Sequence, residues 1–147
     1  MSARKLQASD VDTVIAIGKD SPQASNWSRE SYLKLIEEEG SVALVAEIHV
    51  EICGFLIARR VADQAEILNL AVDTKHRTKG HGSALLKAAL AEVRLRATKT
   101  VYLEVRESNT TAITFYERHG FAKTGLRKDY YRDPVEAAIT MEKKLTG

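Results

Sequence analysis

The pattern of apolar and polar residues along the chain predicts short strands separated by helices. Residues 100–106 give the clearest strand, because apolar side chains fall at every second position. Residues 41–47 and 51–61 are expected to form a hairpin through residues 48–50. The full set of expected strands is 4–8, 41–47, 51–61, 65–73, 100–106, 121–130 and 137–145.

Four other stretches carry helix signals, with a capping residue at the start and apolar residues every three or four positions. The longest is 80–97, in which positions 85, 86, 89, 90 and 93 are apolar and share one helix face. The other expected helices are 10–19, 28–40 and 109–119, with caps at Ser9-Asp10, Ser28 and Asn109 and with Gly120 closing the last.

The order of these elements predicts an α/β (α+β) fold, in which a mixed sheet carries helices on its faces. The strand–helix–strand unit of residues 65–106 is expected to be a right-handed parallel crossover. The chain has 147 residues without repeats or linkers, so residues 1–147 are expected to form a single domain.

Composition and charge weigh against several classes of protein. The net charge is +2, which does not favour a nucleic-acid partner. No apolar run approaches the roughly 20 residues of a membrane helix, and the first residues lack the apolar segment of a signal peptide. A cytoplasmic location without a membrane partner is therefore expected. Cys53, the single cysteine, lies in an apolar strand pattern that favours an inert thiol, and the four histidines lack metal-ligand spacing, so no metal is expected.

A basic loop with two glycines, between strand 65–73 and helix 80–97, is the strongest functional signal. Its backbone N–H groups stand at a helix N-terminus, which suits an anion. A P-loop is excluded because no Gly-Lys-Ser/Thr sequence occurs, and a dinucleotide fingerprint lacks its third glycine, where Leu85 stands. The remaining pattern is Arg77-x-x-Gly80-x-Gly82, whose glycines let the backbone approach a phosphate.

This pattern resembles the acyl-CoA pyrophosphate loop of the GNAT acetyltransferases. A second run supports the resemblance, namely Leu103-Glu104-Val105-Arg106, Ser108-Asn109 and Ala112-Ile113-x-Phe115-Tyr116-Glu117-x-x-Gly120-Phe121. With Tyr130-Tyr131 and Asn26-Trp27-Ser28, the whole chain is similar to the bacterial ribosomal-protein-alanine N-acetyltransferases of the RimI type. The resemblance implies the GNAT fold, with a mostly antiparallel seven-stranded sheet, helices on both faces and splayed central strands. The loop 132–136 departs from that pattern, because it is shorter and lacks glycine where those enzymes bind acceptor peptides.

The resemblance also implies that acetyl-CoA is the co-substrate. The residues expected to surround its diphosphate are Arg77, Thr78, Lys79, Gly80, His81, Gly82 and Ser83. The backbone of Leu70, Ala71 and Val72 is expected to pair with the pantetheine arm. Asn109 is expected to hydrogen-bond coenzyme A, although it also suits the N-cap of the following helix.

Two side chains are candidates for acid–base chemistry. An amine must lose a proton before it attacks a thioester, and Glu104 is the candidate general base; the alternative is a surface glutamate on a half-solvated sheet face. Tyr116 is the candidate general acid that protonates the leaving thiolate; the alternative is a core tyrosine. Trp27, Tyr130 and Tyr131 are candidates for the acceptor groove, with ordinary packing as the alternative.

The expected reaction is direct acetyl transfer in a ternary complex to the α-amine of a protein N-terminus, in particular that of a ribosomal protein. A lysine costs about 3.5 kcal/mol more to deprotonate at neutral pH than an α-amine, which favours the α-amine. Acetylation of a lysine or a small amine is the rival within the enzyme class. A non-catalytic CoA-binding module is the rival outside it. A monomer or weak dimer is expected.

Overall fold

Within the described residues, 2–21, 27–132 and 134–145 of the computed structural model, seven strands form one mixed sheet. The strand order is β1-β2-β3-β4-β5-β7-β6, and only the β4–β5 pair is parallel. The strands are β1 (Ser2–Lys5), β2 (Ser41–Ile48), β3 (Glu51–Val61), β4 (Gln64–Val72), β5 (Thr100–Arg106), β6 (Ala122–Tyr131) and β7 (Glu136–Lys144). The expected mixed, mostly antiparallel sheet is confirmed.

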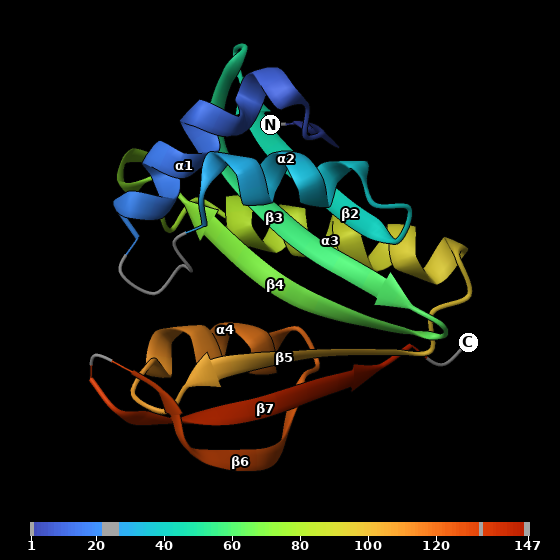
Figure 1. Ribbon diagram of the computed structural model, residues 1–147, viewed down its shortest axis with the longest axis vertical. Coiled ribbons are helices and arrows are strands. Elements are labelled where there is room, and N and C mark those ends of the chain that lie inside the picture. Colours follow the sequence, from blue (N-terminus) through green and yellow to red (C-terminus); the bar gives the residue numbers. More distant parts are fainter. Residues whose placement is uncertain (1, 22–26, 133, 146–147) are drawn as a thin grey trace.

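Helices cover both faces of this sheet, as expected (Figure 1). The helices are α1 (Val11–Lys19), α2 (Arg29–Glu37), α3 (His81–Leu95) and α4 (Thr110–Arg118). One apolar cluster joins α3 and α4 to the sheet, and a second joins α1 and α2 to the opposite face. The predicted face of α3 is correct, because Leu85, Leu86, Ala89 and Val93 are buried in the first cluster.

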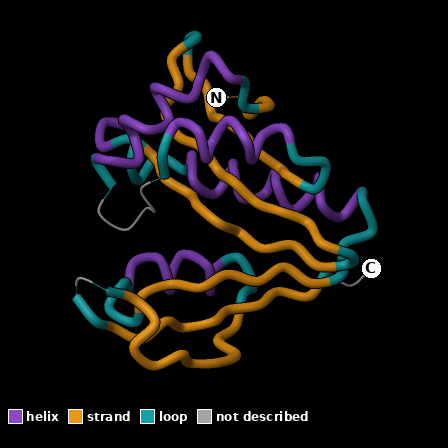
Figure 2. The backbone as a smooth tube through the Cα atoms, viewed as in Figure 1, coloured by secondary structure: helices purple, strands orange, loops and turns teal. Residues whose placement is uncertain are grey.

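The two central strands pair only at one end. β4 and β5 are in register from Gln64↔Thr100 to Glu66↔Tyr102, and beyond this point the strands separate (Figure 2). The expected splay is therefore present. The side chains on the two faces of β5 alternate as predicted, with Val101, Leu103 and Val105 buried.

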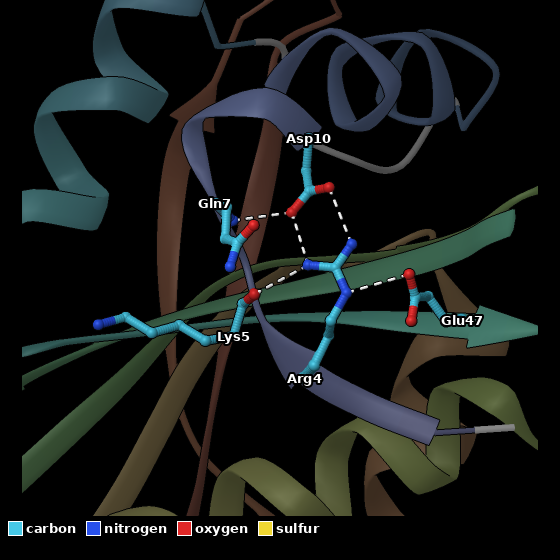
Figure 3. Close-up of polar contacts among 5 residues, drawn as sticks. All are labelled: Arg4, Lys5, Gln7, Asp10 and Glu47. Atoms are coloured by element: carbon cyan, nitrogen blue, oxygen red, sulfur yellow. Dashed lines mark hydrogen bonds and ion pairs between the residues drawn. The ribbon is translucent and has the colours of Figure 1, made fainter. Parts of the chain in front are cut away.

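The N-terminal segment differs from the prediction of a strand at 4–8 and a helix capped by Ser9-Asp10. β1 ends at Lys5, and residues Ala8–Asp10 form a 3-10 turn before α1. The Asp10 carboxylate accepts the Gln7 N–H at 2.8 Å and two hydrogen bonds from the Arg4 guanidinium at 2.8 and 2.9 Å (Figure 3). Asp10 therefore caps the turn and fixes the end of β1, instead of capping α1 with its side chain.

The remaining boundaries shift by a few residues at most. Ser28 caps α2 as predicted by accepting the Ser31 N–H, although α2 ends at Glu37 and not near Gly40. Gly120 follows α4 with a φ of +89°, the left-handed conformation expected for a helix-closing glycine. Cys53 is fully buried, as expected, and burial raises the pKa of its thiol. In the described part of the chain, no helix is long and apolar enough to span a membrane.

Candidate active site

A cavity of about 820 Å³ lies where β4 and β5 separate. Its walls come from β4, β5, α4 and the loop that precedes α3. The predicted site residues that line it are Leu70, Ala71, Val72, Arg77, Thr78, Gly80, His81, Gly82, Ser83, Glu104, Asn109, Tyr116 and Tyr131. The fold thus brings both candidate acid–base residues and most of the glycine loop to one cavity.

An irregularity in β4 places its backbone along this cavity. Ile57 pairs with Asn69 and Ala58 pairs with Ile67, so Leu68 is an additional residue that bends the strand. The register with β5 ends before this point, at Glu66. The backbone of residues 70–72 therefore borders the cavity at an edge that β5 does not cover, as a strand-like pantetheine arm would require.

The glycine loop turns the chain into α3 at the cavity wall. Gly80 is the N-cap of α3 with a φ of +84°, and Thr78 also has a positive φ of 67°. No atom lies within 4 Å of the place where a Cβ of Gly80 would stand, so the backbone there is open to an approaching group. These features bring unpaired N–H groups of the first helical turn to the cavity, which favours an anion.

Arg77 holds this loop in place through three hydrogen bonds. It donates to the carbonyl oxygens of Val72 and Asp20 at 3.1 and 3.2 Å and to the Ser21 hydroxyl at 2.9 Å. The guanidinium therefore ties the end of β4 to the end of α1, while the residue still lines the cavity. Lys79 is exposed and lies outside the lining residues.

His81 is the residue of the loop whose burial calls for an explanation. It is 9% exposed, and its Nε2 atom has no hydrogen-bond partner among the described residues. Its ring contacts the His76 ring, and the His76 Nδ1 atom lies 2.7 Å from Asp73. A buried polar atom without a partner is costly, and a diphosphate at the Gly80 loop is the kind of group that satisfies it. The residues present therefore fit the diphosphate of a CoA ester.

Glu104 projects from β5 on the face opposite the α3 cluster, and its side chain is only 16% exposed. Both carboxylate oxygens accept from Arg127 Nη1, at 3.1 and 3.2 Å. The Arg127 guanidinium also lies 4.9 Å from the centre of the Tyr130 ring. The candidate base is therefore partly buried and ion-paired to an exposed arginine.

Tyr116 projects from α4 into the same cavity, packed edge-on against Phe115 and Phe121. Burial raises the pKa of its phenol above the ordinary value of 10. A phenol is protonated at neutral pH even at its ordinary pKa, so Tyr116 has a proton to donate. Tyr116 belongs to the apolar cluster as well, so the core and the site share this residue.

Asn109 has the capping role that the sequence suggested. Its Oδ1 atom accepts the Ala112 N–H at 3.1 Å at the start of α4. The residue also lines the cavity. Both interpretations of Asn109 are compatible in this geometry.

The three aromatic candidates for the acceptor groove take different positions. Tyr131 lines the cavity beneath the Arg106 guanidinium, and burial raises its pKa to about 12. Tyr130 is 45% exposed beside Arg127. Trp27 packs on Tyr32, with ring centres 5.2 Å apart, away from the cavity lining. Asn26 of the Asn26-Trp27-Ser28 match and Asp133 of the loop 132–136 lie outside the described residues.

A family model of the acetyltransferase (GNAT) family matches residues 12–121, which include the glycine loop, Glu104 and Tyr116. The chain belongs to this family. Membership confirms the expected enzyme class, an N-acetyltransferase, and the GNAT fold.

The chain is also similar to individual N-acetyltransferases of this family. The [ribosomal protein bS18]-alanine N-acetyltransferase of Escherichia coli K12 is 40% identical over 93 residues, 62% of this chain and 63% of that protein. The crystal structure of the ribosomal-protein-S18-alanine N-acetyltransferase from Escherichia coli is 29% identical, with a TM-score of 0.89 over 99% of this chain and 94% of the other. A Thermoplasma acidophilum PaiA N-acetyltransferase solved with coenzyme A is 23% identical over 97% and 98% of the two chains, with a TM-score of 0.82, and shares the fold.

Two charged residues near the candidate base of this GNAT enzyme were not expected from the sequence. Arg127 comes from the edge strand β6, and Glu66 stands at the last paired position of β4. Burial and the charge of Glu104 raise the pKa of Glu66, whose carboxylate accepts from the Tyr102 hydroxyl at 3.5 Å. The charges of both residues were visible in the sequence, but their closeness depends on strand registers that no local pattern specifies.

Proposed function

We propose that this GNAT enzyme transfers the acetyl group of acetyl-CoA to the α-amine of a protein N-terminus, with the N-terminal alanine of a ribosomal protein as the favoured acceptor. The observation that carries the proposal is the presence of Glu104, Tyr116 and the Gly80 loop around one cavity. The names of the Escherichia coli relatives support the choice of an N-terminal alanine.

The donor is expected to lie along the separated edge of β4. Backbone N–H groups of residues 78–83 hold its diphosphate, with the buried His81 Nε2 at the same wall. Ser83 also lines this wall, and its hydroxyl lies 2.9 Å from His119 Nε2. The backbone of Leu70, Ala71 and Val72 pairs with the pantetheine arm, and the Asn109 amide donates to it. Bound acetyl-CoA supplies the acyl thioester, and the protein positions it and moves the protons.

Glu104 and Tyr116 are proposed to manage these protons. Glu104 accepts a proton from the acceptor ammonium group, directly or through a water molecule, so that the neutral amine attacks the acyl carbon. Tyr116, which lines the same cavity, donates its phenolic proton to the departing sulfur. A backbone N–H near Leu70 or Ala71 is expected to polarise the acetyl carbonyl, a contribution of about 2.7–4 kcal/mol in other enzymes.

Transfer is proposed to be direct, within a ternary complex. Cys53 is fully buried on β3 and is absent from the cavity lining, so it is poorly placed to carry an acyl group. Tyr130 and Tyr131 stand near Glu104 and are proposed to contact the acceptor. Trp27 is retained as a weaker candidate, since its ring packs on Tyr32.

The cellular setting follows from the same proposal. With a ribosomal protein as the acceptor, we propose a cytoplasmic location and no direct nucleic-acid or membrane partner. Residues 1–147 are proposed to act as one domain, as a monomer or weak dimer.

The choice of acceptor is tested with a matched pair of peptides. An alanine-starting peptide that contains one lysine is compared with the same peptide blocked at its N-terminus, each incubated with acetyl-CoA and analysed by tandem mass spectrometry. Acetylation of the N-terminal alanine of the first peptide alone is the expected result. Acetylation confined to the lysine of both peptides would overturn the α-amine proposal and favour the lysine rival.

A further inference from the structure

The candidate base is already engaged by a cation from the chain itself. Arg127 reaches Glu104 across β7, which contributes the small residues Ala138 and Thr140 to this face at the paired positions. Its Nη1 atom lies 3.1 Å from Oε2 and 3.2 Å from Oε1 of Glu104. A carboxylate held in this way does not receive an acceptor ammonium at the same position.

The contact is built so that it can be released. The Arg127 side chain is 60% exposed, and β6 pairs with β7 alone within the described sheet. An ion pair with an exposed partner is weak, so a competing cation displaces it easily. Tyr130 contacts the guanidinium and stands in the same exposed region, so the ring is available to a replacement cation.

We propose, on the basis of the proposed function, that Arg127 is a specificity-determining residue that holds the place of the acceptor ammonium on Glu104. An acceptor then enters in its cationic form and displaces the guanidinium before its proton passes to Glu104. In that step an N–H bond of the ammonium breaks and an O–H bond forms on the carboxylate. Acceptors without a positive charge at the reacting end gain nothing from this exchange.

The second carboxylate near the base supports the exchange. Glu66 and Glu104 repel each other, and the charges of Arg59 and Arg127 oppose this effect at Glu66. Removal of Arg127 leaves the repulsion between the two carboxylates less compensated. A cation that arrives in its place is therefore attracted by both acidic groups.

The test compares Arg127→Ala, Arg127→Lys and a matched control, Lys128→Ala, which removes the neighbouring exposed cation of the same strand. The acceptor is the alanine-starting peptide acetylated by the wild type. For Arg127→Ala we expect KM for the peptide to fall by about two- to fivefold, the size set by exposed ion pairs, with kcat unchanged. Arg127→Lys and Lys128→Ala are expected to keep the wild-type KM.

A binding measurement distinguishes two effects of removing Arg127. One is the loss of its competition with the acceptor ammonium for Glu104, and the other is a wider acceptor groove. Calorimetry with CoA-loaded enzyme uses the free-amine peptide and its N-acetylated form as probes. Arg127→Ala should bind the free-amine peptide more tightly by the same factor and the acetylated peptide as the wild type does. Equal tightening for both peptides, or an unchanged or increased KM, would overturn the role of Arg127. Wild-type enzyme that acetylates no α-amine would instead overturn the proposed function, and this inference with it.

Discussion

The two halves of the sheet are built differently. β2 and β3 are covered on both faces, by α1 and α2 on one side and α3 on the other, and most of their residues are buried. β6, at the opposite edge, is exposed along nearly its whole length. The covered half can fix a geometry rigidly, and the open half can admit a large polar partner.

Ion pairs occur in both halves of the sheet, but they differ in their distance from the cavity. The pairs Arg127–Glu104 and Arg106–Glu136 both lie on β5, β6 and β7. In the covered half, Arg4 pairs with Asp10 and Glu47, none of which lines the cavity. The buried Asn69 amide donates to the Tyr32 hydroxyl beneath α2. The cavity lies at the boundary between the halves. The Gly80 loop, which is proposed to bind acetyl-CoA, belongs to the covered half. Glu104 and Tyr131, which are proposed to face the acceptor amine, belong to the open half.

The largest expected effect concerns the base at this boundary. Glu104→Gln keeps the shape of the side chain but cannot accept a proton, so kcat/KM should fall by about 10²–10⁴ while CoA affinity stays near the wild-type value. Steady-state kinetics and calorimetry measure the two quantities. Glu107→Gln, an exposed neighbour in the turn after β5, is the matched control and should act as the wild type. Unaltered turnover in Glu104→Gln would show that Glu104 is not the general base.

The second largest effect is expected on the free energy of unfolding, which should respond differently to substitutions in the two halves. Phe55 on β3 is fully buried against Tyr32, so Phe55→Ala should lower the free energy of unfolding by about 3–5 kcal/mol. Leu126 on β6 is 48% exposed, and Leu126→Ala should change this free energy by no more than about 0.5 kcal/mol. Urea unfolding followed by circular dichroism measures both. Similar losses for the two variants would contradict a division into covered and open halves.

The sequence predicts the elements whose signals are local. The alternation of β5, the apolar face of α3 and the glycines at positions 80 and 120 each depend on a few neighbouring residues, and the structure agrees with them. The approach of Arg127 to Glu104 is different, because 23 residues separate them and two register shifts occur between β6 and β7. A shift of one residue in a strand moves a side chain to the other face, so periodicity alone cannot find this contact.

The N-terminal segment shows a second limit. The sequence predicts Asp10 as a helix cap, but its carboxylate accepts hydrogen bonds from the Arg4 guanidinium and the Gln7 N–H. A charge-assisted pair with a buried partner outweighs the local capping preference. The strand therefore ends earlier than its polar and apolar pattern indicates.

The Arg4–Asp10 pair should also make the free energy of unfolding depend on pH. Hydrogen bonds from Arg4 hold the pKa of Asp10 below the ordinary 3.8 in the folded state. The stabilisation is therefore complete above pH 3.8 and is lost as the pH falls through the lower, folded-state pKa. Asp10→Asn should cost about 1.5–3 kcal/mol at neutral pH and remove this acid-dependent loss. Urea unfolding at a series of pH values from 2 to 7 measures this dependence, with Asp12→Asn, at an exposed position, as the control. An identical acid dependence in the two variants would contradict the role of the Arg4–Asp10 pair.

The smallest effect is expected at the turn where the halves meet. Gly80 has a φ of +84° and open space around its missing side chain, so Gly80→Ala should carry only a backbone cost of about 1–2 kcal/mol. Gly125→Ala on β6 is the matched control, because its Cβ would meet Thr140 at an ordinary contact distance of 3.8 Å. Because the strained residue is the N-cap of α3, the change should weaken CoA binding more than it slows acetyl transfer by the loaded enzyme. Calorimetry with CoA and single-turnover kinetics separate these effects, and CoA affinity equal to that of Gly125→Ala would show that the glycine loop is not the anion site.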